Sequence, residues 1–455
     1  MSTIVYRISV LLGAILADVP VGTNLGLFWL LWALISGRFL LSRGAVFPAL
    51  ADGGLPADAV RRSGAALAYG RWAIQTLVQA WHQMVQQEGR WHAHRYEGFR
   101  PVACDLVGFF RPHLRGCVGK HYQSGADKAL PAIVLAVVAA VGAVGKVRLP
   151  LLRLVLRADP SDGGEAALQR RALLQAGAAL QADEVLVVDA GFGLADLLTA
   201  GVPRFVARVA RNFTARCNVL PAYKGRGRRP TYGTRVRPLP RTHKGKTIVA
   251  TPPDATAQWV VAGRIVRAHV WDNLVLATAQ PGAAPFRCVV IHDPRYQEPW
   301  VLATNLPVSA YALWCLYRDR WPVEQVPLAA KQMLGAHRAF VFGGESRHRL
   351  PELALLAGNV LTYVAATSVA VATGFWDRYC RPTCGRLRRV LLRVDFSEIP
   401  VPAGPLRKKA SVTGHLPTGV RGHRRQKHGC AGASASERPH NTPGQGPSTA
   451  ESCLI

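Results

Sequence analysis

The stretch Tyr317-Arg318-Asp319-Arg320-Trp321-Pro322-Val323-Glu324, continuing to Lys331, decides how the rest of the chain is interpreted. Four of its residues follow the spacing Tyr-x2-Arg-x3-Glu-x6-Lys. On a helix that turns by about 100° per residue, these four side chains fall within about 60° of one another. One face would then carry a carboxylate, which suits a divalent cation, beside two cations, which suit phosphate. An ordinary solvated helix face can carry the same charges, so the pattern requires partner carboxylates elsewhere in the chain.

Two prolines interrupt this stretch. Pro322 and Pro327 each lack a backbone donor, which opposes a single unbroken helix. If Pro322 instead begins a new helix, Glu324 and Lys331 still share a face. Tyr317 and Arg320 would then lie across a kink from them.

The composition indicates the class of partner. The 455 residues include 56 Lys and Arg against 27 acids, a net charge of +29, which favours a polyanion such as nucleic acid or an anionic membrane. The apolar runs Leu25–Ile35 and Pro131–Gly145 are shorter than the roughly 20 residues that a spanning helix needs. Nine cysteines without regular spacing fit a reducing compartment. We therefore expect a soluble, intracellular protein.

The first 95 residues or so have the pattern of helices. A helix from Pro56 to Tyr69, a break at Gly70 and a second helix through Trp81 are compatible with a helix-turn-helix that binds DNA. Helical hairpins that bind nothing share this pattern, so both interpretations stay open. His92 and His94 lie in the polar link that follows, where exposed side chains are expected.

The hydrophobic pattern changes near residue 100 and predicts an α/β fold. Asp105 and Asp189 each end a short apolar run that is typical of a strand. Between them we expect a hairpin and then a helix capped by Asp162; a short helix and another strand follow Asp189. The expected elements are Ala132–Val141, Val147–Arg157, Glu165–Leu180, a helix from Leu194 and Arg204–Val209.

A basic region follows this unit. Residues 197–253 contain thirteen Lys and Arg residues and no acid, with enough Gly and Pro to predict a loop. Short strands then predict a β insertion ahead of Glu324, at Gln258–Val266, Leu274–Ala279, Cys288–Ile291 and Trp300–Thr304. A further helix is expected at about Leu350–Thr373. Residues 404–455 lack apolar periodicity and are predicted to be a disordered basic tail.

Asp105, Asp189 and Glu324 are the candidate partner carboxylates. Three carboxylates can hold two Mg²⁺ ions about 3.5–4 Å apart, an arrangement that activates an attacking oxygen and stabilises a leaving one in phosphodiester chemistry. Each aspartate taken alone could equally be a turn cap. The three together favour a metal site.

The chain resembles the DDE transposases of bacterial insertion sequences that are named for a Tyr-Arg-Glu-Lys signature. Tyr317, Arg320, Glu324 and Lys331 match that signature at every spacing. Val188-Asp189-Ala190-Gly191-Phe192 matches the motif of the second aspartate, and Val102-Ala103-Cys104-Asp105 matches the strand of the first. Trp300 begins a strand that resembles the one in which relatives carry a tryptophan that stacks on a flipped base. The likeness covers about residues 100–340.

The resemblance implies a ribonuclease-H-like catalytic core with an inserted β domain. The expected domains are an N-terminal helical DNA-binding domain at 1–98, a catalytic domain at 99–345 with the insertion at about 212–307, a C-terminal helical region at 346–403 and the tail at 404–455. The implied reaction is cleavage at transposon ends followed by strand transfer into target DNA. A cytoplasmic, nucleoid-associated enzyme is expected, without a membrane partner.

The resemblance also implies roles for particular residues. Asp105, Asp189 and Glu324 would be catalytic and bind two Mg²⁺ ions, for which Mn²⁺ can substitute. The partners would be double-stranded DNA, as terminal inverted repeats and as target, and a second copy of the chain in a synaptic dimer. The residues expected to contact DNA are Tyr317, Arg320, Lys331, Trp300, Arg208, Arg211, Arg226, Arg228 and Arg229.

Two other functions fit the same residues. A metal-dependent nuclease would use the three carboxylates but stop at hydrolysis. A decayed transposase would keep only the DNA binding that the positive charge supports. Strand joining separates the first alternative from a transposase, and the presence of all three acids argues against the second.

Overall fold

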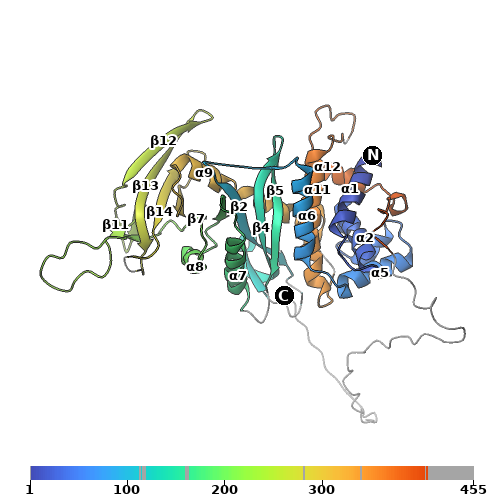
Figure 1. The fold of residues 1–455 in the computed structure, drawn as a ribbon, viewed down its shortest axis with the longest axis horizontal. Helices are drawn as coiled ribbons and strands as arrows, with labels where there is room; N and C mark the ends of the chain where they lie inside the picture. Colours follow the sequence, from blue (N-terminus) through green and yellow to red (C-terminus); the bar gives the residue numbers. More distant parts are fainter. Residues whose placement is uncertain are drawn as a thin grey trace, which may run out of the picture. The chain divides into compact units, whose positions relative to one another are not determined.

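The computed structural model describes residues 2–111, 114, 119–158, 163–279, 282–338, 341–372, 374–404 and 406–407 (Figure 1). These residues belong to one compact unit. The predicted cap Asp162 and nearly all of the predicted tail at 404–455 lie outside the described residues.

The N-terminal region is helical, as predicted. Helix α2 is apolar on every side and lies buried, so it forms the centre of this region rather than one of its faces. Helices α5 and α6 flank Gly70 as expected, and α6 packs along strand β5. The helices are α1 (Ser2–Ile15), α2 (Thr23–Ile35), α3 (Arg38–Leu41), α4 (Val46–Ala51), α5 (Ala57–Tyr69) and α6 (Ile74–Glu88).

The predicted α/β fold is confirmed as a large mixed sheet with helices on both faces. Three antiparallel strands stand in the order β5-β4-β2, and β2, β6 and β7 then run parallel to one another. The strands are β1 (His92–Ala93), β2 (Arg100–Phe110), β3 (Gly119–Gln123), β4 (Lys128–Val144), β5 (Val147–Arg157), β6 (Glu184–Val188) and β7 (Phe205–Arg208).

The sequence pattern predicted that Asp105 ends its strand. In the structure Asp105 lies in the middle of β2 instead. The reason is that Leu106–Phe110 are apolar too and continue the pairing with β4. The hairpin β4–β5 and the strand before Asp189 are confirmed.

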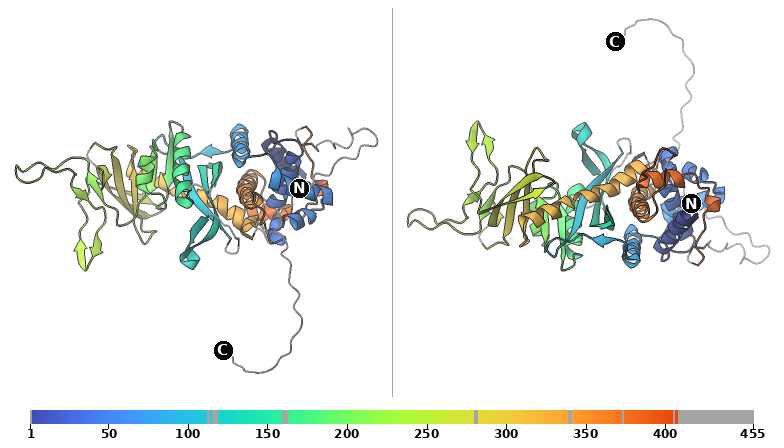
Figure 2. Two further views of the ribbon diagram at one scale, coloured as in Figure 1. Left: turned by 90° about the horizontal axis from the view of Figure 1, so that it is seen from below. Right: turned by 90° about the horizontal axis from the view of Figure 1, so that it is seen from above.

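Two helical layers cover the central strands (Figure 2). On one face, α7 (Glu165–Ala178) and α8 (Leu194–Thr199) share a core with Val102 and Cys104 of β2. The alternate residues of β2, including Ala103 and Val107, face the core that contains α6 and α11. Asp105 belongs to this second set of alternate positions.

The β insertion extends the central sheet because β15 pairs with β7. One predicted strand, Gln258–Val266, is wrong: Ala262 and Gly263 adopt left-handed backbone angles (φ 48° and 78°) and turn the chain between β12 and β13. The strands are β8 (Ala215–Cys217), β9 (Arg235–Val236), β10 (Arg241–His243), β11 (Lys246–Ile248), β12 (Ala255–Val261), β13 (Arg264–Leu276), β14 (Phe286–His292) and β15 (Trp300–Thr304).

The signature stretch is a series of short helical segments. Helix α9 ends at Arg318, and Pro322 lies in the first turn of a new segment, as the alternative with a kink predicted. The segments are α9 (Ala310–Arg318), the 3₁₀ turn η3 (Trp321–Glu324), α10 (Gln325–Leu328) and the π-helical turn η4 (Ala329–Met333). The remaining elements are η1 (Ser124–Ala126), η5 (Ala336–Arg338), α11 (Ser346–Thr367), α12 (Cys384–Leu391) and η6 (Phe396–Glu398).

Helix α11 joins the N-terminal helices to the sheet. The buried Asn359 side chain accepts hydrogen bonds from the Trp81 indole of α6 (2.8 Å) and the Leu152 amide of β5 (3.1 Å). Its amide donates to the Pro150 carbonyl (2.7 Å). Among the described residues, α11 is the helix long and apolar enough to cross a membrane, but 83% of its most apolar window is buried inside the protein. This burial is compatible with a soluble protein.

Candidate active site

The pairing of β2 with β6 brings two of the predicted acids together. Cys104 and Val188 are partners in these parallel strands, so Asp105 and Asp189 occupy the next matching positions. Adjacent strands lie about 4.8 Å apart, and matched residues in parallel strands point to the same face of the sheet. Glu324 reaches this face from η3, which packs against β2 and β4.

The Arg320 guanidinium joins all three acids. Its Nη2 atom lies 2.8 Å from Oε1 of Glu324 and 3.6 Å from Oδ2 of Asp189. The other terminal nitrogen, Nη1, lies 3.7 Å from Oδ2 of Asp105. Arg320 is 3% exposed, whereas the side chains of Asp105, Asp189 and Glu324 are 29%, 35% and 44% exposed. The acids therefore line an accessible surface above a buried cation.

The environment of Asp105 differs from that of an ordinary surface acid. Burial raises the pKa of its carboxyl to about 6, against the opposing effect of the Arg320 cation. Glu324 and Asp189 raise this pKa further because like charges resist a third negative charge beside them. Such a carboxylate gains from any cation that approaches it.

Tyr317 is a buried support for Asp189 in this structure, although the sequence predicted a contact with DNA. Its hydroxyl donates to Oδ1 of Asp189 at 3.1 Å, and the side chain is 1% exposed. Burial, and then the Asp189 charge, raise the pKa of the Tyr317 hydroxyl, so it remains a donor at neutral pH. Arg208, at the end of β7, is close enough to influence the same hydroxyl.

Trp300 lies in the core between two tyrosines. Its ring centroid is 4.6 Å from that of Tyr296 and 5.1 Å from that of Tyr317, and it is 4% exposed. The tryptophan proposed to stack on a base thus packs behind the tyrosine that holds Asp189.

Lys331 lies on the side of Asp105, in η4. Its amino group sits 5.3 Å and 5.8 Å from the ring centroids of Phe109 and Phe110. Burial lowers the pKa of Lys331, and the Asp105 charge opposes this shift. The structure therefore brings all four signature residues to one locality in spite of the break between α9 and η3.

A network that the sequence analysis missed surrounds Asp319, whose side chain is fully buried. Its Oδ2 lies 2.6 Å from Nδ1 of His94 and 2.9 Å from the Tyr96 hydroxyl, and its Oδ1 lies 3.4 Å from Arg148. The prediction of an exposed His94 is wrong. Asp319 sits at the end of α9, directly before Arg320, so the network fixes the point where the chain breaks. The sequence feature that could have indicated this network is an acid, Asp319, placed between two arginines at the end of an otherwise apolar helix.

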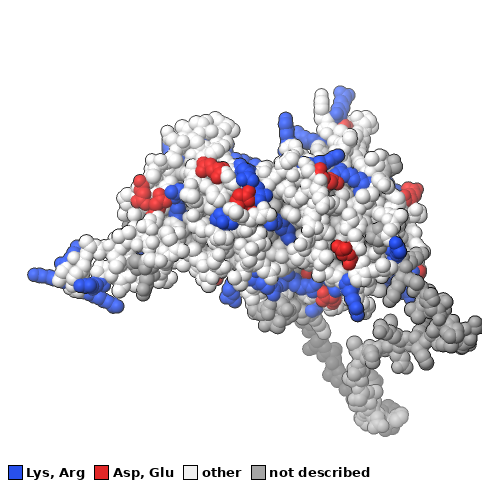
Figure 3. Space-filling model, in the orientation of Figure 1, with Lys and Arg blue, Asp and Glu red and all other residues white. Residues whose placement is uncertain are grey.

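The other predicted DNA contacts lie on the surface. Arg211 pairs with Glu298 and is 62% exposed. Arg226, Arg228 and Arg229 are exposed in the loop between β8 and β9, which projects from the sheet as a long arm (Figures 1 and 3). The Arg229 guanidinium lies over the Tyr223 ring at 5.4 Å.

Other acids near β2 form hydrogen bonds away from Asp189. Glu97 accepts hydrogen bonds from Ser309 at the start of α9, and Asp127 accepts one from Tyr122 in the β3–β4 turn. Asp105 is thus the acid that stands beside Asp189.

The donor set fits a hard divalent cation. Carboxylate oxygens are the ligands that Mg²⁺ prefers, and three acids converge here from β2, from the position directly after β6 and from a 3₁₀ turn. In the described part of the chain, no group of three or more acidic, histidine or cysteine side chains is arranged to hold a metal ion as the structure stands, and Arg320 lies between these three acids.

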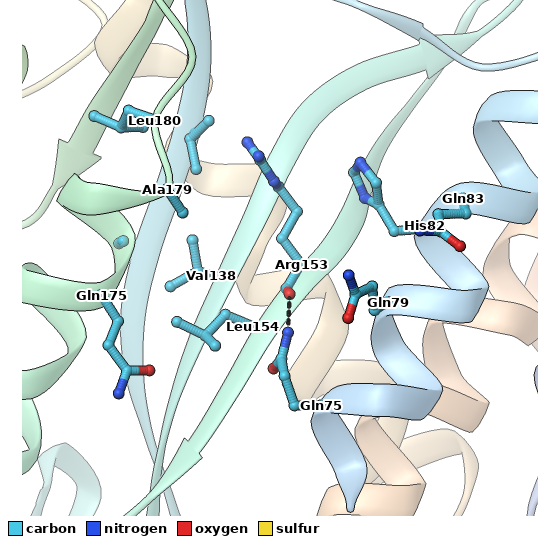
Figure 4. A pocket seen from close by; sticks show the side chains of 12 residues that line it. Gln75, Gln79, His82, Gln83, Val138, Arg153, Leu154, Gln175, Ala179 and Leu180 are labelled. Atoms are coloured by element: carbon cyan, nitrogen blue, oxygen red, sulfur yellow. Dashed lines mark hydrogen bonds between the residues drawn. The ribbon is translucent and has the colours of Figure 1, made fainter. Parts of the chain in front are cut away.

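A separate cavity of about 390 Å³ lies between α7 and α6, beside Val102 of β2 and Val138 of β4 (Figure 4). Glutamines of α6 and α7 and the side chains of His82 and Arg153 line it, with Val138 and Leu154 along the strands. The Gln75 amide donates to the Arg153 carbonyl at 2.8 Å and ties α6 to β5. Because Asp105 points to the opposite face, this cavity is not part of the acid cluster.

No protein-family model matches the chain, and no curated protein matches it.

We predict that His82 makes stability depend on pH. Burial, and then the Arg153 cation, lower the pKa of His82 from 6.5 to about 4. Between these values the unfolded chain binds a proton that the folded chain does not, so stability falls as pH falls from 6.5 towards 4. His82→Gln should remove up to about 1–3 kcal/mol of that loss, as urea unfolding at several pH values would measure. The exposed His92, changed to Gln, serves as control, and identical pH profiles for wild type and His82→Gln would contradict the prediction.

Replacing Asp319 should destabilise the protein strongly. Asp319→Ala leaves His94, Tyr96 and the 41% exposed Arg148 without their shared acceptor, and losing the partner of buried hydrogen-bonding groups costs about 1–3 kcal/mol. Urea unfolding would measure this loss. Asp58→Ala, which removes an exposed carboxylate paired with Arg62, should change stability little. Equal effects of the two substitutions would show that the network is not a structural clamp.

Proposed function

We propose that this protein is a DDE transposase that cleaves DNA at transposon ends and transfers the strand into target DNA. The observation that carries the proposal is the register of β2 and β6, which aligns Asp105 with Asp189, together with the delivery of Glu324 by the signature stretch. An acid pair on adjacent parallel strands is rigid in a way that a pair on loops is not.

The strand connections support a ribonuclease-H-like core. That fold has three antiparallel strands followed by two parallel ones, and the order β5-β4-β2-β6-β7 has this connectivity. The β insertion stands between β7 and α9, which is where the resemblance places it. The strand order and the position of the insertion do not depend on the Tyr-Arg-Glu-Lys spacing, so they support the proposal separately.

Each residue of the cluster has its own proposed role. Asp105, Asp189 and Glu324 would hold two divalent cations, which supply activation of the attacking oxygen and charge stabilisation on the phosphate. Tyr317 holds Asp189 through its hydroxyl and Trp300 supports Tyr317 from behind. Lys331 and Arg208 carry positive charge at the edges of the cluster, where a DNA phosphate would lie.

Double-stranded DNA is the proposed partner. The net charge of +29 and the exposed arginines of the β8–β9 arm favour a polyanion over an uncharged ligand. Action on two transposon ends implies a synaptic dimer, and DNA as substrate implies a cytoplasmic, nucleoid-associated protein. The N-terminal α5 and α6 stay candidates for a second DNA contact, with Arg61 exposed on α5.

Cleavage should depend on each of the three acids. Asp105→Asn, Asp189→Asn and Glu324→Gln should each abolish Mg²⁺-dependent cleavage of DNA that carries the element's own flanking sequence, while DNA binding persists. Gel assays of cleavage and of strand joining would measure this, with Asp272→Asn, a partly exposed acid of β13, as control. Cleavage without joining by wild type would favour a nuclease. An active Asp105→Asn variant would exclude Asp105 from the site.

DNA binding should depend on salt through the β8–β9 arm. Each phosphate contact contributes about 0.9 to the slope of log affinity against log salt, so changing Arg226, Arg228 and Arg229 to Ala should flatten the slope by up to about 3. Changing Arg61 and Arg62 to Ala provides the comparison. A slope that responds only to this second pair would move the DNA contact from the arm to the N-terminal helices.

A further inference from the structure

Arg320 is the cation around which the three acids are arranged. In the described residues, the ion pairs of Asp105, Asp189 and Glu324 all go to its guanidinium. Lys331, the other signature cation, lies over the phenylalanine rings of β2 instead. Arg320 is therefore the cation that pairs with all three acids.

The guanidinium is held in place from several sides. The Arg320 backbone lies in the turn that the Asp319 network fixes, and its guanidinium carbon sits 4.9 Å from the centroid of the Trp321 ring. It is 3% exposed, and its Nε–H is buried without a hydrogen-bond partner. A guanidinium stays charged at every pH that the protein meets, so it cannot leave this position by losing a proton.

The same oxygens are those that a divalent cation would bind. A cation of charge two and the Arg320 guanidinium repel each other, and both need the carboxylate oxygens that lie 2.8 to 3.7 Å from Arg320. A divalent cation bound to the oxygens that face Arg320 would lie beside the guanidinium. Repulsion between the two positive groups would favour movement of the guanidinium when a metal binds.

We propose that Arg320 is an internal counter-ion that competes with divalent cations for Asp105, Asp189 and Glu324. Metal binding then displaces the guanidinium, which becomes available for a DNA phosphate. This inference rests on the proposed function. It assigns Arg320 two successive partners, and it explains how a residue predicted to contact DNA can be buried among acids.

Competition between Arg320 and the metal links metal binding to DNA binding. With Arg320 in place, the metal affinity of the protein is lowered by the work of moving the guanidinium. A DNA phosphate that accepts the displaced guanidinium offsets that work, so DNA and metal each strengthen the binding of the other. A protein without DNA would load metal poorly.

The test measures metal binding rather than activity. Full-length wild type, Arg320→Ala and Arg320→Gln are titrated with Mn²⁺ alone, and free Mn²⁺ is followed by electron paramagnetic resonance. We expect both variants to bind Mn²⁺ at least ~10-fold more tightly than wild type, because three carboxylates then face the metal without a competing charge. Thermal melting should show a lower midpoint without metal and a larger rise on adding Mn²⁺.

Arg318→Ala is the matched control. It removes one positive charge two residues away, from a guanidinium that lies over the Trp314 ring at 4.3 Å. This variant should bind Mn²⁺ like wild type. Tighter binding by Arg318→Ala to the same extent as by Arg320→Ala would assign the effect to net charge and overturn the inference.

A fourth variant distinguishes the proposed metal site from the competition by Arg320. Asp189→Asn should lose most Mn²⁺ affinity. Unchanged binding by Asp189→Asn would overturn both the proposed metal site and the inference. Loss of binding by Asp189→Asn, together with unchanged or weaker binding by the two Arg320 variants, would overturn the inference alone. Arg320→Gln keeps an N–H donor of similar reach, so it provides the comparison if Arg320→Ala does not fold.

Discussion

The site depends on one constraint, the parallel register between β2 and β6. Pairing Cys104 with Val188 puts Asp105 and Asp189 side by side on one face of the sheet. A shift of one residue would send either aspartate to the α7 face, since side chains alternate along a strand. The apolar neighbours on both sides of these strands, such as Val102 and Val187, hold the register because each belongs to a buried core. The placement of the acids is thus a by-product of core packing.

The signature stretch reaches this face by a different physical route. A continuous helix would have been the simplest way to place Tyr317 and Glu324 together, yet the chain breaks between them. The buried carboxylate of Asp319 defines the break, and the proline at position 322 starts the next segment. Tyr317 then approaches Asp189 from α9 while Glu324 approaches from η3, so the cluster is built from both sides of the break.

Much of the fold could be predicted from the sequence, for reasons that particular elements illustrate. The hairpin of β4 and β5 and the strand before Asp189 follow from long apolar runs that only a buried strand explains. The break after Arg318 was foreseen as one of two alternatives, because Pro322 opposes a continuous helix. The mid-strand place of Asp105 and the partners of His94 were not predicted, because they depend on the pairing of β2 with β4 and on contacts with Asp319, which lies far away in the chain. The hydrophobic pattern also failed to predict the turn at Ala262, where a residue other than glycine adopts a left-handed conformation.

The Asp319 network also bears on how this chain can change over evolutionary time. One buried carboxylate serves three residues that come from separate places, namely His94, Tyr96 and Arg148. Loss of the acid would leave these three side chains without their shared acceptor, so a neutral replacement at position 319 favours compensating replacements at the other three. In diverged copies of this sequence, the four positions should therefore vary as a set, and a copy with a partial set would mark a lineage in which the signature stretch has lost its buried anchor.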